Sequence, residues 1–103
     1  MDFKEQLKKD IDTFLNIDEF AEKHIINKKE LNIIIDNETL KERTKKEYEG
    51  IFVGDILYFV KATDYGLPPK AEDIQILDGR QYKVFDVNIQ NGVYEIILQS
   101  ARS

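Results

Sequence analysis

The fold is decided by residues 73–100, DIQILDGRQYKVFDVNIQNGVYEIILQS, which are typical of three β-strands joined by two tight turns. Asn91-Gly92 favours a type I′ turn, because both residues tolerate a positive φ. Pairing outward from this turn places six apolar side chains on one face of the hairpin. The predicted pairs are Ile89 with Tyr94, Val87 with Ile96 and Phe85 with Leu98. Turn chemistry and apolar pattern therefore predict the same register.

The turn at Asp78-Gly79 can be built in two ways. A two-residue loop would pair Ile76 with Gln81 and Ile74 with Lys83, which mixes apolar and polar side chains on each face. A three-residue loop, with Gly79 left-handed and followed by a G1 bulge, pairs Ile76 with Arg80 and Ile74 with Tyr82. It gathers Ile74, Ile76, Tyr82 and Val84 on one face, so we expect the three-residue loop.

In the second strand, the alternation of inward-facing residues shifts by one position between Val84 and Phe85. A β-bulge at this point, or burial of both faces of the strand, would account for the change. Such a bend is typical of a strand at the corner of a small barrel or sandwich.

Composition describes a small acidic protein. The chain has 103 residues and a net charge of −5, which predicts one domain and argues against autonomous binding of duplex DNA. The sequence contains no cysteine, so disulfides, thiolate catalysis and Cys-based zinc sites are excluded, and an intracellular protein is expected. The N-terminus lacks the apolar core of a signal peptide, and no apolar run is long enough to span a membrane.

The N-terminal third predicts a helix followed by a hairpin. Residues 1–15 form an amphipathic pattern with Asp2 as the expected N-cap, and residues 18–22 can add one helical turn. Residues 24–36 are typical of a hairpin that turns at residues 27–30. Ile34 faces away from the other isoleucines, so this strand can be covered on both sides. The single histidine, His24, is expected to be a surface or capping residue.

Residues 36–50 are rich in charge and poor in apolar side chains. Such a segment buries little area to offset its ordering entropy, so we expect a mobile loop that becomes ordered against neighbouring subunits. A permanent helix over residues 38–48 is the alternative, because good helix formers occupy it. The candidate assembly contacts here are Leu40, Lys41, Arg43, Lys45, Lys46 and Tyr48.

Residues 56–60 are apolar on both alternating faces, which predicts a central strand buried on two sides. Residues 63–72 form the loop that follows. Its Leu67-Pro68-Pro69 segment is locally extended and stiff, and these three residues are also candidate assembly contacts.

Catalytic chemistry is not indicated. The carboxylates Asp10 and Asp12 lie on different faces of the predicted helix, so they do not converge. No calcium-loop pattern surrounds Asp36, Glu38 and Glu42. Asp64 and Asp73 are expected to cap or solvate a loop.

Tyrosines could form a stacking surface for single-stranded nucleic acid on an OB-like barrel, and the candidates are Tyr58, Tyr82 and Tyr94. The predicted register turns Tyr82 and Tyr94 inward, which favours core tyrosines instead.

The sequence resembles the small head–tail joining (attachment, head-completion) proteins of long-tailed phages and of prophages in Gram-positive bacteria. The resemblance rests on residues 3–7, 10–11 and 14–22, on residues 57–62 with Asp64 and Gly66, and on residues 77–84 and 92–96. It follows nearly the whole chain in order and includes no catalytic motif.

The resemblance implies a mainly β fold (α+β), a small antiparallel β-barrel or sandwich with an N-terminal amphipathic helix and the long mobile loop. It implies a non-enzymatic virion subunit, with no cofactor or metal, that joins a ring beneath the portal and meets tail proteins. The expected location is the host cytoplasm during assembly and then the virion neck. DNA would only pass through the channel, and no membrane is involved. An OB- or SH3-like module that binds nucleic acid or a host regulator is the alternative.

Overall fold

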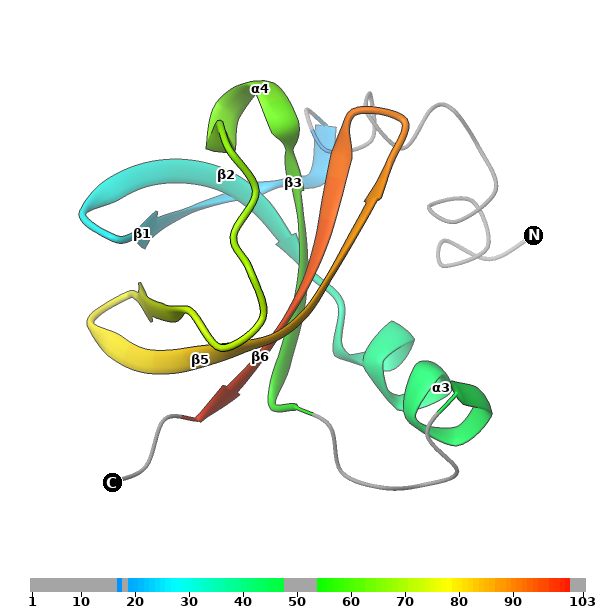
Figure 1. The fold of residues 1–103 in the computed structure, drawn as a ribbon. Coiled ribbons are helices and arrows are strands. Elements are labelled where there is room, and N and C mark those ends of the chain that lie inside the picture. The colour runs from blue at the N-terminus through cyan, green and yellow to red at the C-terminus, as the bar shows by residue number, and fades with distance from the viewer. Residues whose placement is uncertain (1–16, 18, 48–53, 101–103) are drawn as a thin grey trace.

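The computed structural model describes residues 17, 19–47 and 54–100, so the predicted helix over residues 1–15 and Tyr48 lie outside the described residues. The described chain forms a closed antiparallel barrel in the strand order β1-β2-β3-β6-β5-β4 (Figure 1). The prediction of a mainly β fold with a small antiparallel barrel is therefore confirmed. The elements are β1 (Glu22–Ile26), β2 (Lys29–Ile35), α3 (Asn37–Glu47), β3 (Ile56–Lys61), α4 (Ala62–Tyr65), β4 (Ile74–Leu77), β5 (Arg80–Gln90) and β6 (Val93–Ser100).

The β5–β6 hairpin has the predicted turn, with φ of 52° at Asn91 and 76° at Gly92. The predicted pairs Ile89–Tyr94 and Val87–Ile96 are confirmed. The predicted pair Phe85–Leu98 is wrong, because the register shifts between Val84 and Asp86 and Val84 pairs with Leu98 instead. The expected bulge lies there, and it turns the Phe85 side chain to the outside of the barrel.

The expected three-residue loop between β4 and β5 is also wrong. Leu77 pairs with Arg80 across a two-residue turn, with φ of 51° at Asp78 and 84° at Gly79. The inward residues of β4 are Gln75 and Leu77, whereas Ile74 and Ile76 face outward and are 52% and 44% exposed. The apolar pattern was misleading because Gln75 is buried with its amide hydrogen-bonded inside the barrel.

The buried residues form two layers on either side of the sheet. The barrel interior holds alternate residues of β3, among them Tyr58 and Val60. The opposite side of β3 presents Leu57 and Phe59 to a second cluster outside the barrel. This confirms the prediction of a central strand buried on two sides. Gly54 precedes β3, where an added Cβ would lie 2.6 Å from Ile97 Cγ2.

The helix α3 occupies most of the segment expected to be a mobile loop, so that expectation is wrong for residues 37–47 and the helical alternative describes them. Asp36 caps the helix, accepting hydrogen bonds from the Thr39 backbone N–H (3.1 Å) and from Thr39 Oγ1 (2.7 Å). Leu40 reaches the outer core cluster. One buried aliphatic residue and a good cap therefore hold a helix whose composition alone suggested disorder.

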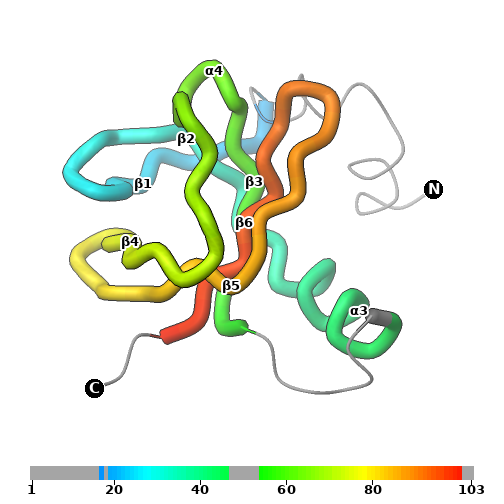
Figure 2. The backbone as a smooth tube through the Cα atoms, in the orientation of Figure 1, coloured from blue at the N-terminus to red at the C-terminus, as the bar shows by residue number. Residues whose placement is uncertain are grey.

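The barrel closes where β1 meets β4, at the single pair Ile26–Leu77. The turns of the β1–β2 and β4–β5 hairpins lie beside each other at this seam, as the tube trace shows (Figure 2). The backbone of Asn27 donates to the carbonyl of Ile76, and the Ile76 N–H donates to Asn27 Oδ1, both at 2.9 Å. Neither described helix is long and apolar enough to cross a lipid bilayer.

Candidate assembly surface

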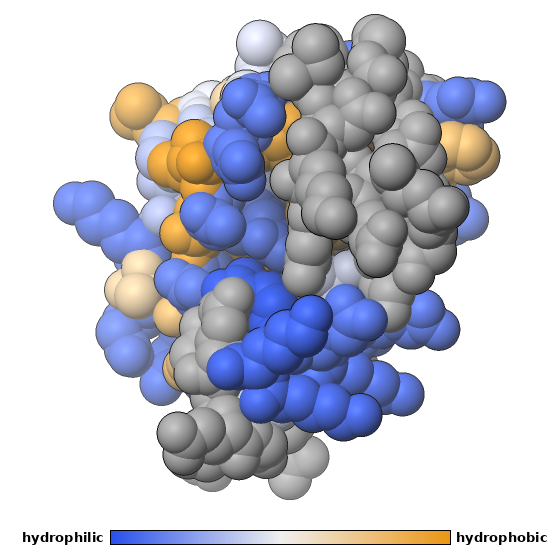
Figure 3. All heavy atoms as spheres, turned by 90° about the vertical axis from the view of Figure 1, so that its right-hand side faces the viewer, coloured by the Kyte–Doolittle hydropathy of each residue, from blue (hydrophilic) through white to orange (hydrophobic). Residues whose placement is uncertain are grey.

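The outer face of α3 is polar. Lys41, Lys45 and Lys46 are exposed there, and hydrophilic side chains gather over this helix (Figure 3). Lys45 and Lys46 lie in the last turn, where positive charge interacts favourably with the helix dipole. The sequence-based candidates at these three positions are therefore accessible to a neighbouring molecule.

Leu40 and Arg43 instead serve the fold of their own chain. Leu40 is 6% exposed and packs in the outer cluster. Arg43 is 8% exposed, with Nη2 placed 3.2 Å from Asp86 Oδ2 and Nη1 placed 3.5 Å from Glu95 Oε1. These contacts tie α3 to β5 and β6. The structure thus places both candidates beneath the outer face of α3 rather than on it.

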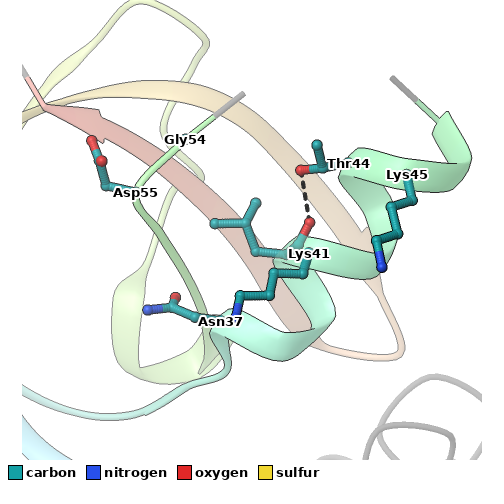
Figure 4. Close-up of a pocket in the computed structure, with 7 residues that line it drawn as sticks. Asn37, Lys41, Thr44, Lys45, Gly54 and Asp55 are labelled. Atoms are coloured by element: carbon teal, nitrogen blue, oxygen red, sulfur yellow. Dashed lines mark hydrogen bonds between the residues drawn. The ribbon is translucent and has the colours of Figure 1, made fainter. Parts of the chain in front are cut away.

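A cavity of about 530 Å³ lies between α3 and the start of β3 (Figure 4). Lys41, Thr44 and Lys45 line it from the helix, and Gly54 and Asp55 line it from the strand side. Two polar groups at its rim are engaged: Asn37 Oδ1 accepts from the Leu57 N–H at 3.1 Å, and Asp55 Oδ2 accepts from the Ser100 N–H at 2.7 Å. Among the described residues that line it, the cavity gathers no set of catalytic groups.

The loop after α4 presents a second group of candidates. Leu67 is 91% exposed, Pro68 is exposed and Pro69 is half-buried. The base of the loop is fixed, because the Tyr94 hydroxyl donates to the carbonyl of Gly66 at 2.5 Å. Gly66 has a φ of 94°, which favours glycine. The loop predicted over residues 63–72 is therefore confirmed from Gly66 onward, with its leucine exposed, but the prediction is wrong for residues 63–65, which belong to α4 (Ala62–Tyr65).

The tyrosines fill the barrel. Tyr58 donates to Gln75 Oε1 at 2.5 Å, and Gln75 Nε2 donates to the Tyr65 hydroxyl at 2.8 Å. Tyr65 and Tyr94 stack edge to face, with ring centroids 5.7 Å apart. Burial raises the pKa of Tyr58 and of Tyr65 above the ordinary value for tyrosine. Tyr58, Tyr82 and Tyr94 are all buried, so they do not form a stacking surface for nucleic acid.

His24 lies at the barrel seam, where its Nδ1 is 2.5 Å from Asp78 Oδ2. Asp78 Oδ1 accepts from the Ile25 N–H at 2.9 Å, and the Asp78 N–H donates to the Ile25 carbonyl at 2.8 Å. The hydrogen bond from His24, reinforced by the one from Ile25, lowers the pKa of Asp78. His24 therefore contributes to closing the barrel, a structural role in keeping with the expectation from sequence.

Two of the carboxylates, Asp36 and Asp73, accept hydrogen bonds from nearby backbone N–H groups and so have structural roles. Asp36 caps α3, and Asp73 Oδ2 accepts from the Lys70 N–H at 2.9 Å within the loop before β4. Asp10 and Asp12 lie outside the described residues. Across residues 17, 19–47 and 54–100, no three histidine, aspartate or glutamate side chains converge as metal ligands would.

Sequence reasoning missed one accessible apolar surface. Ile74 and Ile76 were assigned to the core, but they lie outside, near Ile25 of β1. The Asp78-Gly79 dipeptide was the available signal, since it favours the two-residue type I′ turn that sets this register.

Comparison with known proteins supports the fold and leaves the family open. No protein-family model matches the sequence, and no curated protein matches it significantly. Among solved structures, the chain is similar to an ATP-binding sugar transporter-like protein from Salmonella typhimurium, with a TM-score of 0.52 and 17% sequence identity. The match covers 95% of this chain and 92% of the other. At this identity it shows a shared fold, a small barrel protein, and nothing about activity.

Proposed function

We propose that this chain is a non-enzymatic structural subunit of a phage virion neck, which joins the DNA-filled head, at its portal or adaptor ring, to the tail. The observation that carries the proposal is the agreement between two independent features. The sequence resembles small head–tail joining proteins along nearly its whole length, and the resemblance implies a small antiparallel barrel with an N-terminal amphipathic helix. The described chain is a closed barrel, which agrees with that implied fold, whereas the implied N-terminal helix lies outside the described residues.

The surface of the molecule suits contacts with other proteins. Exposed lysines cover α3, and a fixed loop presents Leu67. The barrel interior is filled by side chains, with Tyr58, Gln75 and Tyr65 joined in one hydrogen-bonded chain. The net charge of −5 is compatible with a channel through which DNA slides without binding.

The proposal is tested with tail-less, DNA-filled heads from a phage strain that lacks this chain. Purified protein added to these heads should co-sediment with them and restore joining to tails. Empty heads without a portal are the control. No co-sedimentation and no joining would contradict the proposal. Salt-dependent binding to oligonucleotides by the isolated protein would instead support the alternative of a nucleic-acid module.

A further inference from the structure

The short strand β4 buries a polar side chain and exposes two apolar ones. Gln75 is 1% exposed inside the barrel, whereas Ile74 and Ile76 are 52% and 44% exposed on its outside. Successive residues of a strand face opposite sides, so a slip by one residue would exchange the two faces of β4. Two isoleucines would then replace Gln75 and Leu77 in the interior. Apolar burial alone therefore favours a register other than the observed one.

The turn between β4 and β5 favours the observed register without excluding the slipped one. In the observed two-residue turn, Asp78 and Gly79 both have a positive φ, and Leu77 pairs with Arg80. A three-residue loop needs a left-handed residue only at its last position, which Gly79 would occupy, and a G1 bulge after it. Ile76 would then pair with Arg80. Turn chemistry therefore does not by itself decide between the two registers.

Hydrogen bonds inside the barrel are available to Gln75 in the observed register only. The Tyr58 hydroxyl donates to Gln75 Oε1 at 2.5 Å, and Gln75 Nε2 donates to the Tyr65 hydroxyl at 2.8 Å. Tyr58 is fully buried, so its hydroxyl would lose this partner if Gln75 turned outward. The isoleucines on either side of Gln75 carry no side-chain donor or acceptor that could replace it. A slip would therefore leave a buried polar group unpaired, which costs free energy.

The other contacts of β4 discriminate less between the two registers. Its outer edge pairs with β1 only at Ile26–Leu77, beside a few backbone hydrogen bonds. Backbone bonds can form again after a slip, because every residue of β4 offers the same N–H and C=O groups. The Asp78 carboxylate would also lose its partners, but its side chain is 49% exposed, so water can replace them. Gln75 is thus the buried side chain of β4 that distinguishes the registers.

We propose that Gln75 selects the register of β4, and that β4 slips by one residue toward the turn when the hydrogen bonds of Gln75 are removed. A single buried polar side chain can fix the register of packed elements in this way. The slip lengthens the turn by one residue and shortens the loop before β4 by one residue, about 3.3 Å of strand. That loop carries the exposed Leu67, so Gln75 also sets the length of a candidate contact loop. This role does not depend on the proposed function.

Lysine substitutions on the two faces of β4 test whether a second register exists. Q75K puts a charge in the interior, so the strand should slip, carry the charge to the surface and stay folded. I76K should stay folded in the observed register. The double variant buries a lysine in either register, so it should unfold, with a loss of melting temperature well beyond the sum of the single losses. Q81K, at an exposed position of β5, is the matched control. An unfolded Q75K, or losses that simply add, would overturn the proposal.

Disulfide trapping then reads the register directly, because the sequence contains no native cysteine. I76C with Q81C reports the observed register, in which these positions are paired, and I76C with R80C reports the slipped one. The first pair should oxidise severalfold faster in the presence of Gln75. The milder variant Q75S, whose side chain is too short to reach both tyrosines, should reverse this preference. An unchanged preference in Q75S would refute the proposal even if Q75K were folded.

Discussion

At the scale of single residues, the barrel depends on a few backbone positions with positive φ. Asp78-Gly79 and Asn91-Gly92 form the two-residue turns that set the registers of β4 with β5 and of β5 with β6. An added Cβ at Gly79 would meet no heavy atom within 4 Å, so only backbone strain opposes a side chain there. Substitutions at these glycines therefore report conformational strain.

Replacing either glycine by valine should destabilise the protein. A β-branched residue at a φ of 76° (Gly92) or 84° (Gly79) costs about 1–3 kcal/mol, so Gly92→Val and Gly79→Val should lower the free energy of unfolding by that amount. Urea denaturation measures the loss. Gly92→Asn is the control, because asparagine tolerates this region and should cost less. Full stability of the two valine variants would contradict the turn assignment.

Asp78 makes the stability of the seam depend on pH. Its pKa is lowered in the folded protein, chiefly by the hydrogen bond with His24 and then by that from the Ile25 N–H. A carboxylate with a lowered folded pKa stabilises the fold above its unfolded pKa, and this contribution disappears as pH falls through the folded value. Stability should therefore decline as the solution is acidified below the ordinary range of aspartate.

Asp78→Asn should flatten that acidic decline and reduce stability near neutral pH. Denaturation midpoints measured from about pH 7 to about pH 2, which spans the ordinary aspartate pKa and the values below it, provide the comparison. Asp64→Asn, at a carboxylate on α4 rather than in the seam, is the control and should keep the parent's decline. An unchanged pH profile in Asp78→Asn would exclude the proposed role of this carboxylate.

At the scale of elements, much of the fold could be predicted from sequence, and the failures have physical causes. The strand positions, the Asn91-Gly92 turn and the doubly buried β3 follow from turn chemistry and apolar pattern. The register of β4 could not be predicted in this way, because the buried polar residue Gln75 faces inward, whereas the apolar pattern predicted that the isoleucines would. The Phe85 pairing failed because a bulge shifts the register by one residue.

The helix α3 shows how tertiary contacts decide an element that composition leaves open. Its sequence has few apolar residues, yet Leu40 is buried, Arg43 reaches Asp86 and Glu95, and Asp36 caps its first turn. The sequence could place the lysines of the candidate assembly surface but could not show that Leu40 and Arg43 face inward. That distinction depends on partners from β3, β5 and β6.

Removing the cap should loosen α3 more than the barrel. Asp36→Ala deletes the acceptor of both Thr39 hydrogen bonds and should cost about 1 kcal/mol. Hydrogen exchange of the α3 amides should accelerate, with the amides of β3 and β6 less affected. Glu38→Ala, an exposed position in the same turn, is the control. Rapid exchange of α3 already in the parent protein would show that the helix is not a lasting element in solution.

At the scale of the whole molecule, the protein is a small acidic barrel whose candidate contact residues are spread over separate regions. The exposed lysines belong to α3, and Leu67 belongs to the loop between α4 and β4. Under the proposed function, assembly would use several of these exposed groups together.

The purified protein should therefore be a monomer or a weak oligomer. Sedimentation at low micromolar concentration should show mainly a species of 12.1 kDa, because the net charge of −5 and the small patches disfavour tight self-association. Raising the salt concentration screens the repulsion between acidic chains and so tests how much this repulsion limits association. We expect association to increase only slightly. A stable ring at that concentration, without any partner, would contradict this expectation.

The seam between β1 and β4 also has a consequence for the order in which we expect the chain to fold. Residues 25–27 meet residues 76–78 there, whereas β5 and β6 are joined by a two-residue turn and can pair early. Closing the seam brings together residues 26 and 77, which are far apart in the sequence, and therefore costs much loop-closure entropy. We expect this closure to occur after the rate-limiting step of folding. Disrupting it should raise the unfolding rate and leave the folding rate nearly unchanged, as stopped-flow kinetics of Asp78→Asn would show. We therefore expect the seam to be the last contact made on folding and the first lost on unfolding.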